Sequence, residues 1–244
     1  MLHFKRLAPI ALAGFLTACG GSSSTNGDPN ANPMPVPTPD PVPTPAMEYQ
    51  YQVTVTNLTN SQPLSPLALV LHETGQVWQI GQSASTMLEN LAESGDNSGV
   101  MGADFVVSSA SNDGILLPGM SAEVMIMTTD MMASNFSLAT MLVNTNDAFT
   151  GLNAIDLSMM EVGGMMMFKP GVYDAGTEGN TEMPGTIPGP ADGGEGLNVA
   201  RDDVDFVAMH PGVVTADDGL SSSVLTGEHK FDNPALSVKI MRMQ

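Results

Sequence analysis

The sequence predicts a single antiparallel β-sandwich with one short helix. Three observations favour this all-β fold class. The chain contains many short apolar or alternating runs, glycine-rich connectors separate them, and only one segment has helical periodicity. We therefore expect a single folded domain whose core lies between two sheets.

The clearest strand is predicted at residues 49–57, where tyrosine and valine alternate with glutamine and threonine. Such period-two alternation is typical of a half-buried strand. Further strands are predicted at PLALVLH (66–72), QVWQIG (76–81), ADFVVSS (103–109), SAEVMIMTT (121–129), FSLATMLVN (136–144), MMMFKP (165–170), VDFVAMH (204–210) and ALSVKIMRM (235–243). In the last run the alternation slips at Met241, which predicts a β-bulge.

The one helix is predicted to begin after a cap at Ser83 and to end at Gly95. Between them, apolar residues recur with the spacing i, i+3, i+4, i+7 and i+8, which gives the helix one apolar face. The run NTNDAFTGLNAIDL (144–157) is interpreted as a turn, with Gly151 allowing the bend and its apolar residues contacting the core.

The first 19 residues are typical of an export signal. Lys5 and Arg6 precede an apolar run that is too short to span a bilayer, and small residues come just before Cys19. Because the run ends on a cysteine, residues 1–19 resemble a bacterial lipoprotein signal with lipidation at Cys19. Gly20 follows the cysteine and favours an outer-membrane lipoprotein in a Gram-negative envelope, facing the periplasm or the cell surface. A plain secretory signal is the alternative.

Residues 20–47 are predicted to be a disordered tether, because proline occupies every second position from Pro33 to Pro45. Proline fixes φ and lacks an amide donor, so this segment is expected to be an extended spacer. Residues 48–244 would then form the folded domain.

The composition limits the partners. Without the signal the chain has five basic residues against 26 acidic ones, a net charge of −21. Such a charge repels nucleic acid and attracts cations, so no nucleic-acid partner is expected. Cys19 is the only cysteine, which excludes disulfides and cysteine metal sites from residues 48–244.

Six short motifs follow one another along the chain between about Tyr49 and Met243. They are SPLALVLH, G-x-x-A-S-x-x-L-x-x-L-A-E-S-G-D, M-L-V-x-T-N-D-A-F-x-G, I-D-L, Y-D-A-G-T-E and a closing N-P-x-x-x-V-x-I. The ordered set resembles the spondin N-terminal domain in its bacterial form. The resemblance implies an eight-stranded antiparallel sandwich, similar to the calcium-dependent membrane-binding sandwiches, that binds one calcium ion and acts in adhesion and recognition without catalysis.

The resemblance also implies the calcium ligands. Asp156 and Asp174 match two calcium-binding aspartates of the family, and Glu123 is the nearest acid to the position of a third. Asp156 and Asp174 flank the expected strand at 165–170, so adjacent strand ends could bring their carboxylates together. Two such carboxylates repel each other, so without a cation one of them should take up a proton or the two loops should move apart.

Three further polar residues are candidates at this site. The loop DAGTEGNTE (174–182) has oxygen ligands on glycine-bearing backbone, as calcium requires, with Glu178 among them; a solvated turn is the alternative. Asn146 and Asp147 would either brace the loop by hydrogen bonds or face the ligand.

Two other functions remain open. The 20 methionines permit a Met-rich copper-binding periplasmic protein, since thioethers bind Cu(I), although methionines in strand patterns are expected to fill the core. A hydrolase using Asp156 and Asp174 as a carboxylate pair is the other alternative. The sequence favours a monomeric, non-catalytic, calcium-binding lipoprotein, held at the membrane by its lipid, that recognises an unidentified protein or glycan.

Overall fold

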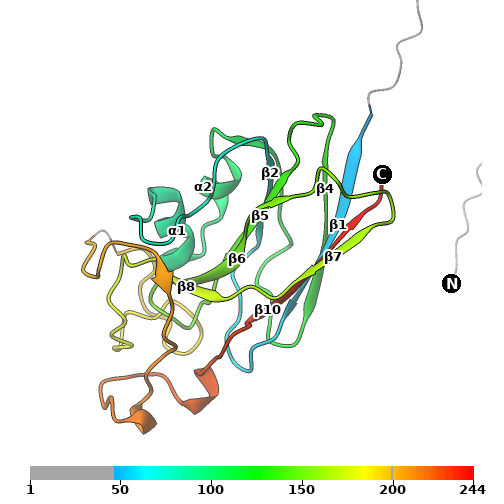
Figure 1. Cartoon of the computed structure of the whole chain (residues 1–244). Helices are drawn as coiled ribbons and strands as arrows, with labels where there is room; N and C mark the ends of the chain where they lie inside the picture. The colour runs from blue at the N-terminus through cyan, green and yellow to red at the C-terminus, as the bar shows by residue number, and fades with distance from the viewer. Residues whose placement is uncertain (1–46, 199) are drawn as a thin grey trace, which may run out of the picture. The chain divides into compact units, whose positions relative to one another are not determined.

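The structure, a computed structural model, describes residues 47–198 and 200–244. The predicted signal, Cys19 and the tether up to residue 46 lie outside these residues. Two antiparallel sheets pack face to face (Figure 1), one with four strands and one with six. The all-β sandwich class that the sequence predicts is confirmed.

The four-stranded sheet has the order β4-β1-β10-β7. Its strands are β1 (Tyr49–Asn57), β4 (Ser121–Thr128), β7 (Met165–Phe168) and β10 (Leu236–Arg242). The predicted strand at residues 49–57 is confirmed: Val53 and Val55 are buried, and the polar residues Gln52, Thr54 and Thr56 that alternate with them are partly exposed.

The six-stranded sheet has the order β3-β2-β5-β6-β8-β9. Its strands are β2 (Ala68–His72), β3 (Val106–Ala110), β5 (Asn135–Met141), β6 (Ala148–Asp156), β8 (Val172–Asp174) and β9 (Ala208–Met209). The two sheets together hold ten strands, where the resemblance implies eight, and β9 has only two residues.

The main core lies between the sheets. Inward residues of β1, β4 and β10 meet those of β2, β5 and β6, and the largest fully buried side chain among them is Phe136. Burial of this apolar surface is the main force that holds the two sheets together.

Two helices cover the outer face of the six-stranded sheet (Figure 1): α1 (Thr86–Ser94) and α2 (Ser98–Met101). A second core forms there between Leu88 and Leu91 of α1 and the sheet residues Val70 and Phe149. Strand β2 is therefore buried on both faces, which explains why its sequence is apolar without alternation. Two short 3₁₀ helices, Ala216–Asp218 and Gly227–His229, lie in the loops before β10.

The predicted end of the helix at Gly95 is confirmed, with φ 71° and amide bonds to the last turn. The cap is Ser85, two residues later than predicted, because its hydroxyl accepts a hydrogen bond from Leu88 N at 3.4 Å. Ser83 instead donates to the carbonyl of Asp205 at 2.9 Å. The bulge predicted at Met241 is absent, since β10 pairs with β1 in continuous register through this residue.

The interpretation of residues 144–157 as a turn is wrong, since most of this run forms β6. Its alternation is hidden by a register shift against β5 and by Ala154, whose φ is 53°. Gly151 does not bend the chain. It lets β5 approach closely, because a Cβ there would collide with the carbonyl of Leu138.

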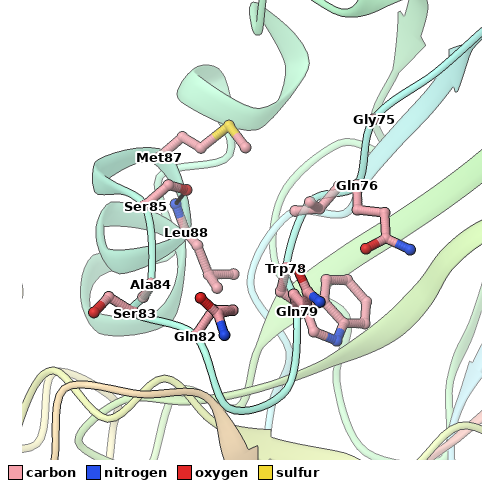
Figure 2. A pocket seen from close by; sticks show the side chains of 11 residues that line it. Gly75, Gln76, Trp78, Gln79, Gln82, Ser83, Ala84, Ser85, Met87 and Leu88 are labelled. Carbon is pink, nitrogen blue, oxygen red and sulfur yellow. Dashed lines mark hydrogen bonds between the residues drawn. The ribbon is translucent and has the colours of Figure 1, made fainter.

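The strand predicted at residues 76–81 is also wrong. This segment runs past the start of α1 without joining a sheet (Figure 2). The side chain of Asn153 replaces a strand partner: it accepts a hydrogen bond from Val77 N at 3.0 Å and donates one to Trp78 O at 2.6 Å. One side-chain amide thus satisfies the backbone where the sequence suggested a ladder.

We expect Asn153→Ala to lower the free energy of unfolding by about 1–3 kcal/mol, because two backbone groups lose their partner. Denaturant unfolding followed by the fluorescence of Trp78, the only tryptophan, measures this. The matched control is Asn60→Ala, which removes two long, exposed hydrogen bonds, to Ser61 Oγ at 3.5 Å and to Glu228 O at 3.3 Å, and should cost less than about 0.5 kcal/mol. Equal losses in the two variants would contradict the expected role of Asn153.

In the part of the chain that the structure describes, no helix combines the length and the apolar character needed to cross a membrane.

Candidate functional site

The connection from β5 to β6 contains four consecutive buried polar residues, at 144–147. Thr145 holds this connection in a tight loop: its hydroxyl donates to Leu142 O at 2.6 Å and accepts from Ala148 N at 3.1 Å. The loop places Asp147 immediately before the first residue of β6, with its side chain fully buried.

The Asp147 carboxylate is only half satisfied. Its Oδ2 accepts hydrogen bonds from Thr177 N at 2.8 Å and Glu178 N at 3.2 Å. Its Oδ1 has no hydrogen-bond partner, although it is buried. A buried carboxylate oxygen without a partner is costly, because it has lost its hydration without replacement.

Asp174 lies beside Asp147, because Ala148 at the start of β6 is paired with Asp174 at the end of β8. Asp174 accepts hydrogen bonds from Gly176 N at 2.8 Å and from the Asn180 side chain at 2.6 Å. Gly176 has φ 70°, and a Cβ there would collide with the carbonyl of Phe206. The tight DAGT turn that directs Asp174 therefore requires glycine.

Asn146 joins the β5–β6 loop to two further acids. Its amide donates to Glu178 Oε1 at 2.8 Å, and its Oδ1 accepts a hydrogen bond from Glu182 N at 3.3 Å. The sequence left open whether Asn146 braces the loop by hydrogen bonds or faces a ligand, and these contacts show that it braces the loop. The Oε2 atoms of Glu178 and Glu182 are buried without a partner.

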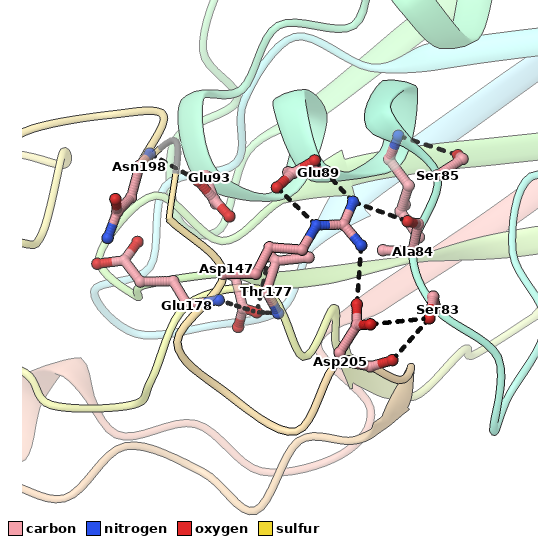
Figure 3. A network of polar contacts seen from close by, with 12 residues as sticks. Ser83, Ala84, Ser85, Glu89, Glu93, Asp147, Thr177, Glu178, Asn198 and Asp205 are labelled. Atoms are coloured by element: carbon pink, nitrogen blue, oxygen red, sulfur yellow. Dashed lines mark hydrogen bonds and ion pairs between the residues drawn. The ribbon is translucent and has the colours of Figure 1, made fainter.

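Helix α1 contributes Glu93 from its last turn (Figure 3). Its Oε2 accepts a hydrogen bond from Asn198 N at 2.8 Å, while its Oε1 is buried without a partner. Glu93 belongs to the same acidic group as Glu178, since its negative charge raises the pKa of Glu178.

Burial raises the pKa values of these carboxyls. Asp147 reaches a pKa of about 7, because desolvation disfavours its charged form and the neighbouring Asp174 charge adds to the effect. Burial likewise raises the pKa of Glu178 to about 7 and shifts the pKa of Glu93 upward. The hydrogen bonds from Thr177 and Asn146 oppose these shifts without cancelling them.

Among the described residues, no Lys or Arg side chain forms an ion pair with this group, and the nearby charge of Arg201 lowers the pKa of Glu93 without cancelling the effect of burial. The three ion pairs among residues 47–198 and 200–244 use other acids: Arg201 binds Glu89 and Asp205, and Lys230 binds Asp218. We call Glu93, Asp147, Asp174 and Glu178 the acidic site. Its unpaired oxygens can be satisfied by protons or by a hard cation.

Within the described part of the chain, no three His, Cys, Asp or Glu side chains form a ready-made group of metal ligands. The carboxylates of the acidic site instead accept hydrogen bonds from backbone and side-chain amides. One oxygen each of Glu93, Asp147 and Glu178 has no partner, whereas both oxygens of Asp174 are bound. Donors of this type suit calcium, which accepts six to eight oxygens in a flexible geometry.

The structure does not bring Asp156 and Asp174 together. Asp174 is paired with the first residue of β6, whereas Asp156 is the last, roughly 25 Å further along at about 3.3 Å per residue. The exposed Asp156 accepts a hydrogen bond from Ser158 N at 2.8 Å, which lowers its pKa. The predicted pairing of these two aspartates, as metal ligands or as a hydrolase pair, is therefore wrong.

Glu123 is also remote from Asp174. It lies on the exposed face of β4, opposite Thr54 of β1, in the other sheet. The expectation that Glu123 supplies a third ligand beside Asp174 is therefore wrong, because proximity in sequence to the family's ligand position does not bring it to the same sheet.

Most of the clustered methionines do not fill the core, which corrects another expectation. Met125 and Met127 of β4 and Met165 and Met167 of β7 are exposed on the outer face of the four-stranded sheet. Their neighbours in sequence point inward, as strand alternation requires. The copper hypothesis stays untested.

Sequence reasoning missed Glu93 as a site residue. Glu93 lies within the motif L-A-E-S-G-D and follows the apolar stripe of α1 directly, so an acid at the edge of that buried stripe was the available signal.

No protein-family model matches this chain, and no curated protein shows significant sequence similarity to it.

Proposed function

We propose that this chain is a non-catalytic recognition module of the cell envelope whose sandwich binds calcium at the acidic site. The observation that carries the proposal is the set of buried carboxylate oxygens without partners: Glu93 Oε1, Asp147 Oδ1 and Glu178 Oε2. A carboxyl group held in this way needs a proton or a cation at neutral pH.

Calcium is the cation that fits these donors best. The acidic site offers only oxygen ligands, and its residues come from α1, the β5–β6 loop and the loop after β8. Zinc prefers nitrogen or sulfur, and magnesium requires a near-ideal octahedron with several waters. Glu93, Asp147 and Glu178 would supply the direct contacts, and Asp174 would add negative charge beside them.

A bound calcium ion would tie together segments that are far apart in the sequence. Glu93 ends α1, Asp147 precedes β6, and Glu178 lies in the loop after β8. Neutralising their charges removes the repulsion among them and orders the two loops. The ordered loops would form part of the recognition surface for a protein or glycan, as the resemblance to spondin domains implies.

The location is part of the proposal and is supported by the sequence alone. The signal-like segment ending at Cys19 would place a lipid on the mature chain, and the proline-rich residues 20–47 would tether the domain to the outer membrane.

Calorimetric titration of the chelator-treated protein with CaCl₂ tests the calcium site. We expect saturable binding by the wild type and at least about a tenfold weaker affinity in Glu93→Gln, which removes a direct contact. Asp156→Asn is the matched control, because it also removes one carboxylate charge, but at the far end of β6. The calcium affinity of this variant should equal that of the wild type. Circular dichroism establishes that each variant is folded.

Two outcomes would contradict this assignment. A folded wild type that gives no binding heat at millimolar calcium excludes the calcium site. Weakened binding in Asp156→Asn but not in Glu93→Gln would place the ion elsewhere.

A further inference from the structure

A second site lies beside α1, on the outer face of the six-stranded sheet. A pocket of about 600 Å³ opens between residues 75–85 and the first turn of the helix (Figure 2). This volume is in the range of about 300–1,000 Å³ that holds small ligands in proteins. We propose that this pocket binds a neutral saccharide.

The lining of the pocket is polar but uncharged. It consists of Gly75, Gln76, Val77, Trp78, Gln79, Gln82, Ser83, Ala84, Ser85, Met87 and Leu88. None of these residues is acidic or basic, although the chain contains 26 acidic residues. Asp205 and Arg201 bind the lining residues Ser83 and Ala84, but they pair with each other. The lining therefore gives neither a cation nor an anion an unpaired charged partner, so the chemistry selects a neutral ligand.

Three glutamines supply the polar contacts. The side chains of Gln76, Gln79 and Gln82 are exposed, and their amides form no hydrogen bonds with other residues that the structure describes. Each amide carries an acceptor oxygen and a donor NH₂ group. Sugar hydroxyls both donate and accept, and they therefore match such amides without requiring charge.

The floor of the pocket is apolar. Val77, Trp78 and Leu88 are buried, and Trp78 packs edge-on against Phe149 with ring centroids 5.1 Å apart. An apolar floor below polar side chains suits the C–H faces of a sugar ring, whose hydroxyls point outward.

The backbone of the pocket is fixed before any ligand binds. Asn153 holds residues 77 and 78, and Gln82 O accepts a hydrogen bond from Val207 N at 2.9 Å. Ser85 caps α1. A preorganised site loses little entropy on binding, which favours measurable affinity even for a small neutral ligand.

A peptide strand fits this pocket less well. Peptides that bind along a backbone add a strand to an exposed sheet edge, but residues 75–85 belong to no sheet. An extended peptide would therefore find amide side chains here and no ladder of backbone donors and acceptors.

The pocket adjoins the acidic site through shared elements, and its assignment rests on the proposed recognition function. Helix α1 carries Leu88 in the pocket and Glu93 in the acidic site. Trp78 packs against Phe149 and Tyr173, which are two residues after Asp147 and one residue before Asp174. Calcium at the acidic site would therefore stiffen the floor of the pocket.

The test uses the fluorescence of Trp78, which is the only tryptophan and lines the pocket. The wild type is titrated with maltotriose, cellotriose, mannotriose and tri-N-acetylchitotriose, in calcium and in EDTA. A neutral hexapeptide with blocked termini is the rival probe. We expect saturable binding of at least one trisaccharide below about 10 mM.

A double variant and its matched control locate the binding. Gln79→Ala with Gln82→Ala removes two amides from the pocket and should weaken binding at least about tenfold. Gln50→Ala with Gln52→Ala removes two amides from β1 in the other sheet and should leave the affinity unchanged. Melting curves establish that both variants are folded.

Several results would overturn the proposal: no trisaccharide binding in the folded wild type, equal binding in both double variants, or binding of the hexapeptide alone. Calcium calorimetry on the same samples separates the two sites. Calcium binding without saccharide binding overturns the pocket assignment and leaves the acidic site standing. Saccharide binding without calcium binding supports the pocket and contradicts the calcium site.

Discussion

Calcium raises the melting temperature of the wild-type chain by roughly 10 °C if the acidic site binds it. Saturation at 100 to 1,000 times the dissociation constant stabilises the native state by about 3–4 kcal/mol. In a domain of this size about 1 kcal/mol corresponds to a shift of about 2–4 °C. Differential scanning calorimetry in EDTA and in millimolar CaCl₂ measures the shift, with MgCl₂ as the control ion.

The variant Asp147→Asn sharpens this prediction. The difference between its melting temperature and that of the wild type should change sign when calcium is added. In EDTA at pH 8 the neutral amide removes a buried charge beside Asp174, so the variant should melt at or above the wild-type temperature. In calcium the variant lacks a direct ligand and should melt well below the wild type. Asp156→Asn, at the exposed end of β6, should follow the wild type in both buffers.

A calcium shift that is equal in the wild type and in Asp147→Asn would show that Asp147 is not a ligand. An Asp147→Asn variant that is less stable than the wild type in EDTA at pH 8 would show that the buried carboxylate is satisfied without an ion.

The second large effect is a loss of stability of the calcium-free protein as the pH rises. Burial raises the pKa of Asp147 to about 7 in the folded state, against 3.8 for an ordinary aspartate. Between these two pH values the folded chain keeps a proton on Asp147 that the unfolded chain has lost. Retaining this proton stabilises the folded state. The stabilisation is fully present below pH about 4 and is lost as the pH rises through 7. Between pH 6 and 8 the loss is about 1 kcal/mol for this carboxyl, and Glu178, with a pKa of about 7, acts in the same direction.

Two histidines act in the opposite direction. Burial lowers the pKa values of His72 and His210, so their contribution to stability rises with pH until the unfolded histidines are neutral, near pH 6.5. The effect of Asp147 is therefore measured as a difference between two proteins that share both histidines.

We expect urea unfolding in EDTA to show the wild type losing about 1 kcal/mol relative to Asp147→Asn between pH 6 and pH 8. Repeating the series in calcium should reverse the trend in the wild type, because the ion displaces the protons and binds more tightly as the pH rises. Parallel curves for the two proteins in EDTA would mean that the pKa of Asp147 is not raised, which contradicts the expected cost of burying its unpartnered Oδ1.

Some elements could be predicted from the sequence because their signals are local. Alternation at residues 49–57 gave β1, and the apolar spacing with Gly95 gave the end of α1. These signals depend on neighbours within a few residues along the chain. The all-β sandwich class followed from the number and shortness of such runs, and the structure confirms it.

Other elements depended on partners that no local pattern reveals. The strand β6 was taken for a turn, since burial on both faces and a register shift against β5 removed its alternation. The segment around Trp78 was taken for a strand, although a single distant side chain, Asn153, binds its backbone.

The acidic site shows the same division. By itself the sequence determined an acidic chain and a motif containing Asp174 and Glu178, and it predicted an export signal. Only the tertiary structure decided which acids meet. The antiparallel register of β6 and β8 sets Asp147, and not Asp156, beside Asp174, and the packing of α1 on the sheet adds Glu93. Strand register and helix docking are fixed by burial across the whole core, so separations along the chain could not reveal them.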